Sequence, residues 1–206
     1  LRFFCLVSCS GAPRTSGGGG LWLFALASVL FFPSTVAVES SFPLLLLLFT
    51  QIGHNLGYAH SNEGGQSYAD QTGMMGYSYG QDDGPTMCFN AAKSWQTQWY
   101  VSKSTTVDPS AGTCYEGKLY GIADFSNAAS TVVLAKIDDA SATDYFVTFN
   151  RQTGINSGTQ EAGNLVTVTT TGNEGTSYAE SSLLAKLGAG GSWSGTIDGK
   201  TMVVSD

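Results

Sequence analysis

Residues 51–60 read Gln-Ile-Gly-His-Asn-Leu-Gly-Tyr-Ala-His, and this short stretch decides which fold and which chemistry we expect. Its His54 and His60 are the only histidines in the 206-residue sequence, and Gly57 lies midway between them. Histidine is the commonest metal ligand in proteins. Because the sequence holds no other imidazole, these two alone should bind zinc weakly. Gly57 should adopt a backbone conformation open mainly to glycine.

The stretch resembles the active-site motif of the metzincin zinc proteases, His-Glu-x-x-His-x-x-Gly-x-x-His. In that motif a helix presents two histidines and a glutamate, and a glycine turns the chain toward a third histidine. The resemblance makes His54 and His60 the second and third metal ligands, with Gly57 as the turn. Thr50 and Gln51 stand where the first histidine and the glutamate belong. Gln51 thus occupies the general-base position, but its amide cannot act as a base.

Residues 68–77 read Tyr-Ala-Asp-Gln-Thr-Gly-Met-Met-Gly-Tyr and resemble the metzincin Met-turn, in which a methionine forms an apolar floor beneath the metal ligands. The resemblance assigns Met75 to this floor. It places Tyr77 where some metzincins contact zinc or stabilise the oxyanion, with simple packing as the alternative. Asp70 is expected to brace the turn rather than to bind metal.

Residues 88–96 read Cys-Phe-Asn-Ala-Ala-Lys-Ser-Trp-Gln and predict a helix with Asn90 as its N-cap. Trp95 and Trp99 lie one helical turn apart and are expected to be core aromatics. From residue 52 to about residue 190 the chain resembles the gametolysin family of zinc metallopeptidases. That resemblance implies an α+β fold whose first part is the C-terminal half of a metzincin catalytic domain, with an active-site helix, the Met-turn and a C-terminal helix.

The resemblance implies a secreted, extracellular zinc metalloendopeptidase, a hydrolase whose substrates are extracellular-matrix or cell-wall glycoproteins. An intact member would hold one zinc ion. This chain lacks the general base and one ligand, so we expect weak or absent zinc binding and little activity. A catalytically dead pseudo-protease or glycoprotein-binding module is the alternative. The nine Lys and Arg residues and a pI near 4.6 argue against a nucleic-acid partner.

Residues 1–51 differ in composition from the rest of the chain, and we treat them as an unstructured or spurious leader. One interpretation is a secretory signal with small residues at a cleavage site near 36–37. A membrane helix is disfavoured, because prolines interrupt the apolar runs and neither run reaches the ~18 apolar residues of a span. The third interpretation is translated intron sequence, since residues 41–49 can be encoded by pyrimidines and Gln51 by CAG.

Residues 103–113 predict a linker between the catalytic remnant at 52–102 and a β module at 114–206. In the β module, runs rich in Val, Thr, Tyr and Phe alternate with turn signals, which predicts a small antiparallel β-sandwich. Residues 181–187 are expected to form a short helix closed by Gly188. The predicted strands are 131–137, 145–150, 164–170 and 201–205.

Cys88 and Cys114 form a candidate disulfide that would tie the catalytic remnant to the β module. Such a bond fits an extracellular protease, and two free buried thiols are the alternative. Cys5 and Cys9 lie in the leader and carry little weight.

Overall fold

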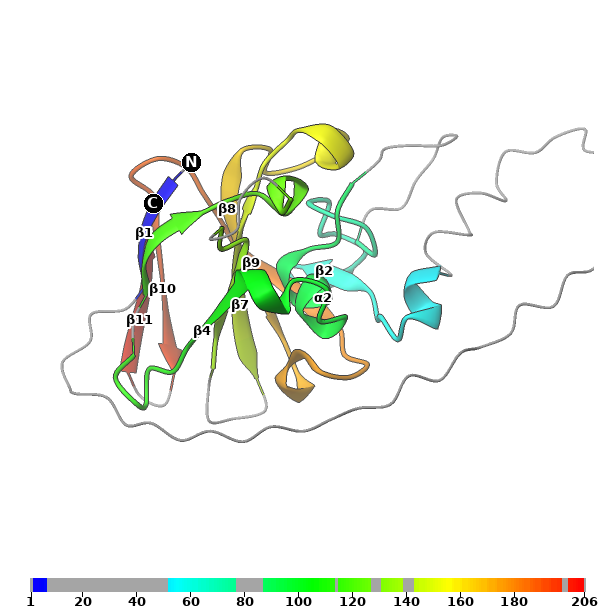
Figure 1. Cartoon of the computed structure of the whole chain (residues 1–206). Coiled ribbons are helices and arrows are strands. Elements are labelled where there is room, and N and C mark those ends of the chain that lie inside the picture. Colours follow the sequence, from blue (N-terminus) through cyan, green and yellow to red (C-terminus); the bar gives the residue numbers. More distant parts are fainter. Residues whose placement is uncertain are drawn as a thin grey trace, which may run out of the picture.

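The computed structural model describes residues 2–6, 52–76, 87–113, 115–126, 131–138, 143–197 and 200–205 of the chain. Strands dominate these residues and form two sheets (Figure 1). Gln51, Tyr77 and Cys114, to which the sequence assigns roles, lie outside the described residues.

The larger sheet has seven strands in the order β3-β2-β9-β8-β7-β6-β4. Two neighbouring pairs are parallel, β2 with β9 and β4 with β6. The other pairs are antiparallel, so the sheet is mixed. Its strands are β2 (Ser61–Glu63), β3 (Gln66–Ser67), β4 (Ser104–Val107), β6 (Leu134–Ile137), β7 (Asp144–Asn150), β8 (Leu165–Thr171) and β9 (Ser181–Leu187).

The smaller sheet has four antiparallel strands in the order β10-β11-β1-β5. Figure 1 shows β1, β10 and β11 side by side at one side of the larger sheet. The first strand in the sequence therefore pairs with the last, and both chain ends lie close together in this layer. The strands are β1 (Arg2–Leu6), β5 (Tyr115–Leu119), β10 (Ser192–Ile197) and β11 (Lys200–Ser205).

The described helices are all short. The longest is α2 (Ala91–Gln96), whose N-cap Asn90 accepts a hydrogen bond from the Lys93 backbone N–H at 3.0 Å, as predicted. A single helical turn covers residues 52–55. The 3₁₀-helices are η1 (Val101–Lys103), η2 (Ile122–Asp124), η3 (Gly154–Asn156) and η4 (Asn173–Gly175).

Both faces of the central strands β7 and β8 are buried, which suits their content of β-branched and aromatic residues. On one face Val147 and Val168 belong to a core cluster that includes Leu119 of β5. On the other face Phe146 packs in a second cluster with Ala91 and Ala92 of α2. The larger sheet is thus covered by the smaller sheet on one side and by α2 on the other.

The predicted fold class is wrong. The described part of the chain is mostly β, with one seven-stranded mixed sheet and no helix of seven or more residues, so it contains no metzincin active-site helix. The larger sheet is mixed because β2, from the predicted catalytic remnant, and β4, from the predicted linker, each pair in parallel with a strand of the predicted β module. After His60 the chain extends as β2 and pairs in parallel with β9, instead of staying within a helical catalytic remnant.

Four predicted strands are confirmed as β6, β7, β8 and β11. The helix predicted at 181–187 is wrong, because those residues form β9. The alternating burial of Ser181 and Leu183 along that strand and its pairing with β8 outweigh the helix propensity of Leu, Ala and Lys. Part of the predicted linker is also a strand: β4 pairs with β6.

The two tryptophans near α2 differ in burial. Trp95 is partly buried and packs near Phe146, with ring centroids 6.0 Å apart. Trp99 is 55% exposed, because α2 ends at Gln96 and the chain leaves the core before reaching it. The prediction of a core aromatic is therefore wrong for Trp99.

Cys88 is a free cysteine in the structure, and burial raises the pKa of its thiol to about 11. Its predicted partner, Cys114, lies outside the described residues. The disulfide between them therefore stays a prediction.

Candidate functional site

His54 is held by the backbone just after its helical turn. Its Nδ1 lies 2.7 Å from the carbonyl oxygen of Tyr58, a residue with 0% exposure. Since a carbonyl can only accept, Nδ1 carries the proton in this contact and Nε2 is left with its lone pair. A backbone carbonyl on the far nitrogen is a common way to orient a metal-binding histidine.

Gly57 ends the helical turn and redirects the chain, as predicted. Its φ is +81°, in the left-handed region where glycine is favoured. Its carbonyl accepts a hydrogen bond of 2.6 Å from the side-chain amide of Gln96, which ties the turn to α2. Beyond it, the His60 carbonyl accepts from the backbone N–H of Ser181, the first residue of β9. The turn and the sheet thus both position His60.

The two imidazoles face each other. Their Nε2 atoms lie 3.2 Å apart, with ring centroids 5.0 Å apart and planes inclined by 66°. Both residues are partly exposed. Two nitrogens bound to one tetrahedral zinc at about 2.0–2.1 Å lie about 3.3 Å apart. The pair therefore has the separation of two ligands of a single ion, and His54 and His60 fit a zinc site.

Tyr68 contacts His60, although no sequence motif assigns a role to its side chain. Its hydroxyl oxygen lies 2.6 Å from His60 Nε2, and the two ring centroids are 3.9 Å apart. The hairpin β2–β3 brings it there: Gly64 and Gly65, both with positive φ, reverse the chain, and Tyr68 follows β3, eight residues after His60. The spacing of His60 and Tyr68 in the sequence does not predict this contact, because the contact forms only when the hairpin folds.

Met75 packs against the helical turn that carries His54. It is 1% exposed, and a Cβ added to Gly53 would collide with its sulfur. The Met75 carbonyl accepts a hydrogen bond of 3.0 Å from the backbone N–H of Ser61, at the start of β2. The structure thus places Met75 directly beside Gly53, the residue before His54.

Asp70 braces the Met75 loop, as expected from the sequence. It has 0% exposure, and its Oδ1 accepts from the backbone N–H and the hydroxyl of Thr72 at 3.0 and 2.5 Å. Its Oδ2 accepts from the Asn90 amide at 2.9 Å. The same Asn90 amide reaches the hydroxyl oxygens of Ser61 and Ser181 at 3.1 and 3.0 Å. This buried network, which we call the Asp70 network, joins the loop to α2, β2 and β9.

The electrostatic surroundings favour a neutral His60. Burial and the neighbouring His54 lower the pKa of His60 from its usual 6.5, and Glu180 opposes this shift. Lys93 also lowers it. Burial lowers the pKa of Lys93 itself to about 8, and its Nζ donates to the Ala179 carbonyl at 2.7 Å. A neutral imidazole is the form that binds a metal ion.

An apolar cavity of about 260 Å³ lies beside the helical turn but does not include the imidazoles. Ile52 and Leu56, one turn apart, line it from the turn. Across from them lie Phe89, Trp99 and Phe125. Several of these large side chains are exposed. The cavity adjoins the histidine pair, but neither imidazole lines it.

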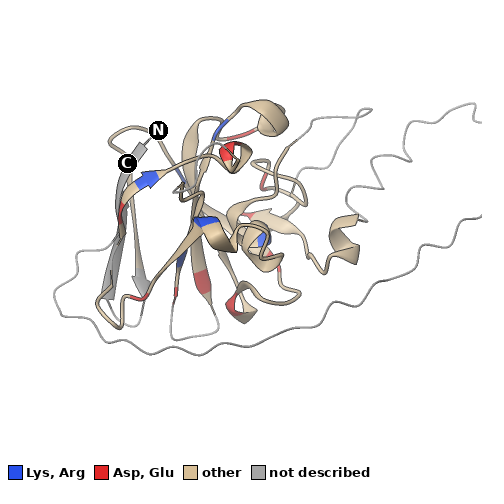
Figure 2. Cartoon of the chain, viewed as in Figure 1, with Lys and Arg blue, Asp and Glu red and all other residues tan. Residues whose placement is uncertain are grey.

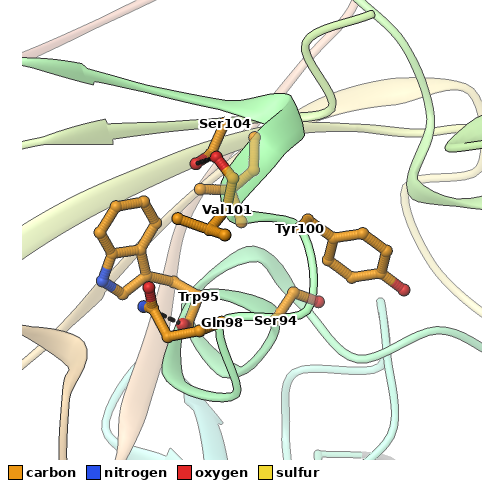
Figure 3. Close-up of a pocket in the computed structure, with 7 residues that line it drawn as sticks. Ser94, Trp95, Gln98, Tyr100, Val101 and Ser104 are labelled. Carbon is orange, nitrogen blue, oxygen red and sulfur yellow. Dashed lines mark hydrogen bonds between the residues drawn. The ribbon is translucent and has the colours of Figure 1, made fainter. Parts of the chain in front are cut away.

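A second depression lies between α2 and β4 (Figure 3). Ser94, Trp95 and Tyr100 line it together with Val101 and other residues, and it holds no room for water. The Gln98 side chain folds over it and donates to the Trp95 carbonyl at 2.7 Å (Figure 3). This depression is a packing crevice rather than a ligand site.

Charged residues are scattered over the described elements rather than gathered in a stripe (Figure 2). In the part of the chain that the structure describes, no group of three His, Cys, Asp or Glu side chains could hold a metal ion. Among the same residues no helix is long and apolar enough to cross a membrane. Within the described residues, the two imidazoles are therefore not joined by a third His, Cys, Asp or Glu donor.

No family model, curated protein or solved structure matches the chain. The gametolysin resemblance therefore stays a prediction from sequence motifs. The geometry around His54 and His60 is the independent observation on which a function can be proposed.

Proposed function

We propose that the chain carries the zinc site of a secreted metalloendopeptidase of the gametolysin type, which acts on matrix or cell-wall glycoproteins, and that His54 and His60 bind the metal. The single observation that supports this most is the 3.2 Å separation of their Nε2 atoms. The proposal rests on the imidazole pair and not on a metzincin fold, because the described residues do not have that fold.

Each neighbour of the pair has a role in this proposal. Tyr58 orients His54 through its carbonyl, and Gly57 turns the chain so that His60 faces it. Met75 packs against Gly53, the residue before His54, and so supports the helical turn. A bound zinc ion would supply Lewis acidity and a lowered pKa for water.

Position 51 limits the activity of the chain as given. A protease of this class needs a carboxylate that takes a proton from water and passes it to the leaving amine. Gln51 cannot do this, so we expect metal binding with little peptide hydrolysis. This same residue favours the second candidate, an inert pseudo-protease that binds a glycoprotein.

Zinc titration of the full chain tests the proposal. We expect one zinc ion per chain, bound weakly, in equilibrium dialysis or calorimetry. His54→Ala and His60→Ala should each weaken binding by more than the ~10–100-fold that loss of an outer-shell partner costs. Cys88→Ala is the matched control, because it removes a thiol that could bind zinc and should leave the affinity unchanged. Zinc binding that survives both histidine changes would disprove this site.

A further inference from the structure

We propose that the phenol oxygen of Tyr68 is the third protein ligand of this site, so that the ion is held by two imidazole nitrogens and one phenolate oxygen. This inference rests on the proposed zinc site at His54 and His60. It names a ligand of a residue type that the sequence motif does not contain.

The first support is that two donor atoms lie close to His60 Nε2. His60 Nε2 lies 3.2 Å from His54 Nε2 and 2.6 Å from the Tyr68 hydroxyl oxygen. The three side chains come from separate pieces of backbone: the helical turn, the segment before β2, and the residue after β3. The 2.6 Å contact is a hydrogen-bond distance rather than a ligand separation, so the Tyr68 oxygen must move away from His60 Nε2 by about half an ångström when the ion binds.

The second support is that protons alone do not satisfy these contacts. When His54 is neutral, its Nδ1 bears the proton shared with Tyr58, and its Nε2 can only accept. If His60 Nε2 is unprotonated, two lone pairs face each other at 3.2 Å. If it is protonated, the phenol cannot donate to it and one hydrogen must serve two acceptors. A cation between the three atoms removes this conflict.

The third support is the backbone of Tyr68. Its φ is +63°, in the left-handed region that is rare and costly for a bulky residue. Burial does not compensate for this cost, because Tyr68 is 42% exposed. Strained backbone conformations cluster at ligand sites. In this conformation the Tyr68 hydroxyl reaches His60.

Binding requires one proton transfer and no redox change. The phenol O–H bond breaks as the oxygen–metal bond forms, and the proton passes to water. Metal binding should therefore release a proton that a variant without the phenol would not release. With Cu²⁺ as a probe, a phenolate ligand should also give a charge-transfer band in the visible spectrum.

The test uses the full chain and three variants: Tyr68→Phe, Tyr178→Phe as a matched exposed tyrosine, and Tyr77→Phe for the position that the sequence motif favours. Zn²⁺ affinity, proton release and the Cu²⁺ spectrum are measured for each. Tyr68→Phe should weaken zinc binding by at least ~10–100-fold, abolish the visible band and reduce the released protons by about one. Both other variants should keep the visible band, and Tyr178→Phe should also keep the zinc affinity and the proton release of the unchanged chain.

The outcomes separate this inference from the proposed function. Zinc binding that depends on both histidines but not on Tyr68 would overturn the third ligand and leave the zinc site standing. Loss of the band in Tyr77→Phe instead of Tyr68→Phe would do the same. If the unchanged chain binds no zinc, the proposed function and the third ligand both fail.

Discussion

Asp70→Asn should lower the free energy of unfolding by about 3 kcal/mol, because all of its partners are donors. The Thr72 N–H and hydroxyl donate to one carboxylate oxygen, and the Asn90 amide donates to the other. An asparagine at this position has one acceptor oxygen and one amide, so its amide must face a donor in either orientation. With 0% exposure, water cannot relieve that conflict.

The structure also predicts a rescue. In the double variant Asp70→Asn with Asn90→Asp, the new amide at position 70 can donate to the new carboxylate at position 90. That carboxylate can still cap α2 by accepting from Lys93, and the hydroxyls of Ser61 and Ser181 can donate to it. Urea unfolding of the single and double variants measures the effect. A double variant no more stable than Asp70→Asn would contradict the donor count.

Gly76→Ala should destabilise the chain by about 3 kcal/mol or more and weaken zinc binding. A Cβ on Gly76 would collide with the backbone carbonyl of Asp70, and backbone cannot swing aside as a flexible side chain can. The strain would fall on Met75, the preceding residue, whose φ is already +78°. Since Met75 packs against Gly53 beside His54, the imidazole pair should lose its alignment.

Gly172→Ala is the matched control for this substitution. Gly172 has φ −79°, and a Cβ there would meet nothing within 4 Å. Its effect should stay within about 1 kcal/mol. Thermal unfolding and zinc affinity of both variants check the prediction. Equal effects of the two alanines would show that the Met75 loop is not tightly packed against Asp70.

Local signals in the sequence predicted those parts of the site that depend on nearby residues. Gly57 terminates a helical turn, Asn90 caps α2 and Asp70 braces its loop, and each of these depends on contacts that a motif or cap rule describes. The strands with clear alternation, such as β7, were predictable for the same reason.

The parts that could not be predicted depend on pairing between distant segments. Residues 181–187 carry strong helix formers, yet they lie between β8 and β2 as a strand. Tyr68 reaches His60 only because the hairpin folds back. The metzincin helix was expected from the motif alone, but the described residues contain no such helix, and residues 52–55 form a single helical turn.

Anomalous diffraction at the zinc edge from crystals of the zinc-loaded chain tests the central claim most directly. We predict one strong peak about 2.0–2.1 Å from the Nε2 atoms of both His54 and His60, with the Tyr68 oxygen also bound. A peak at other residues, or no peak with zinc in excess, would contradict a metal site between the two imidazoles.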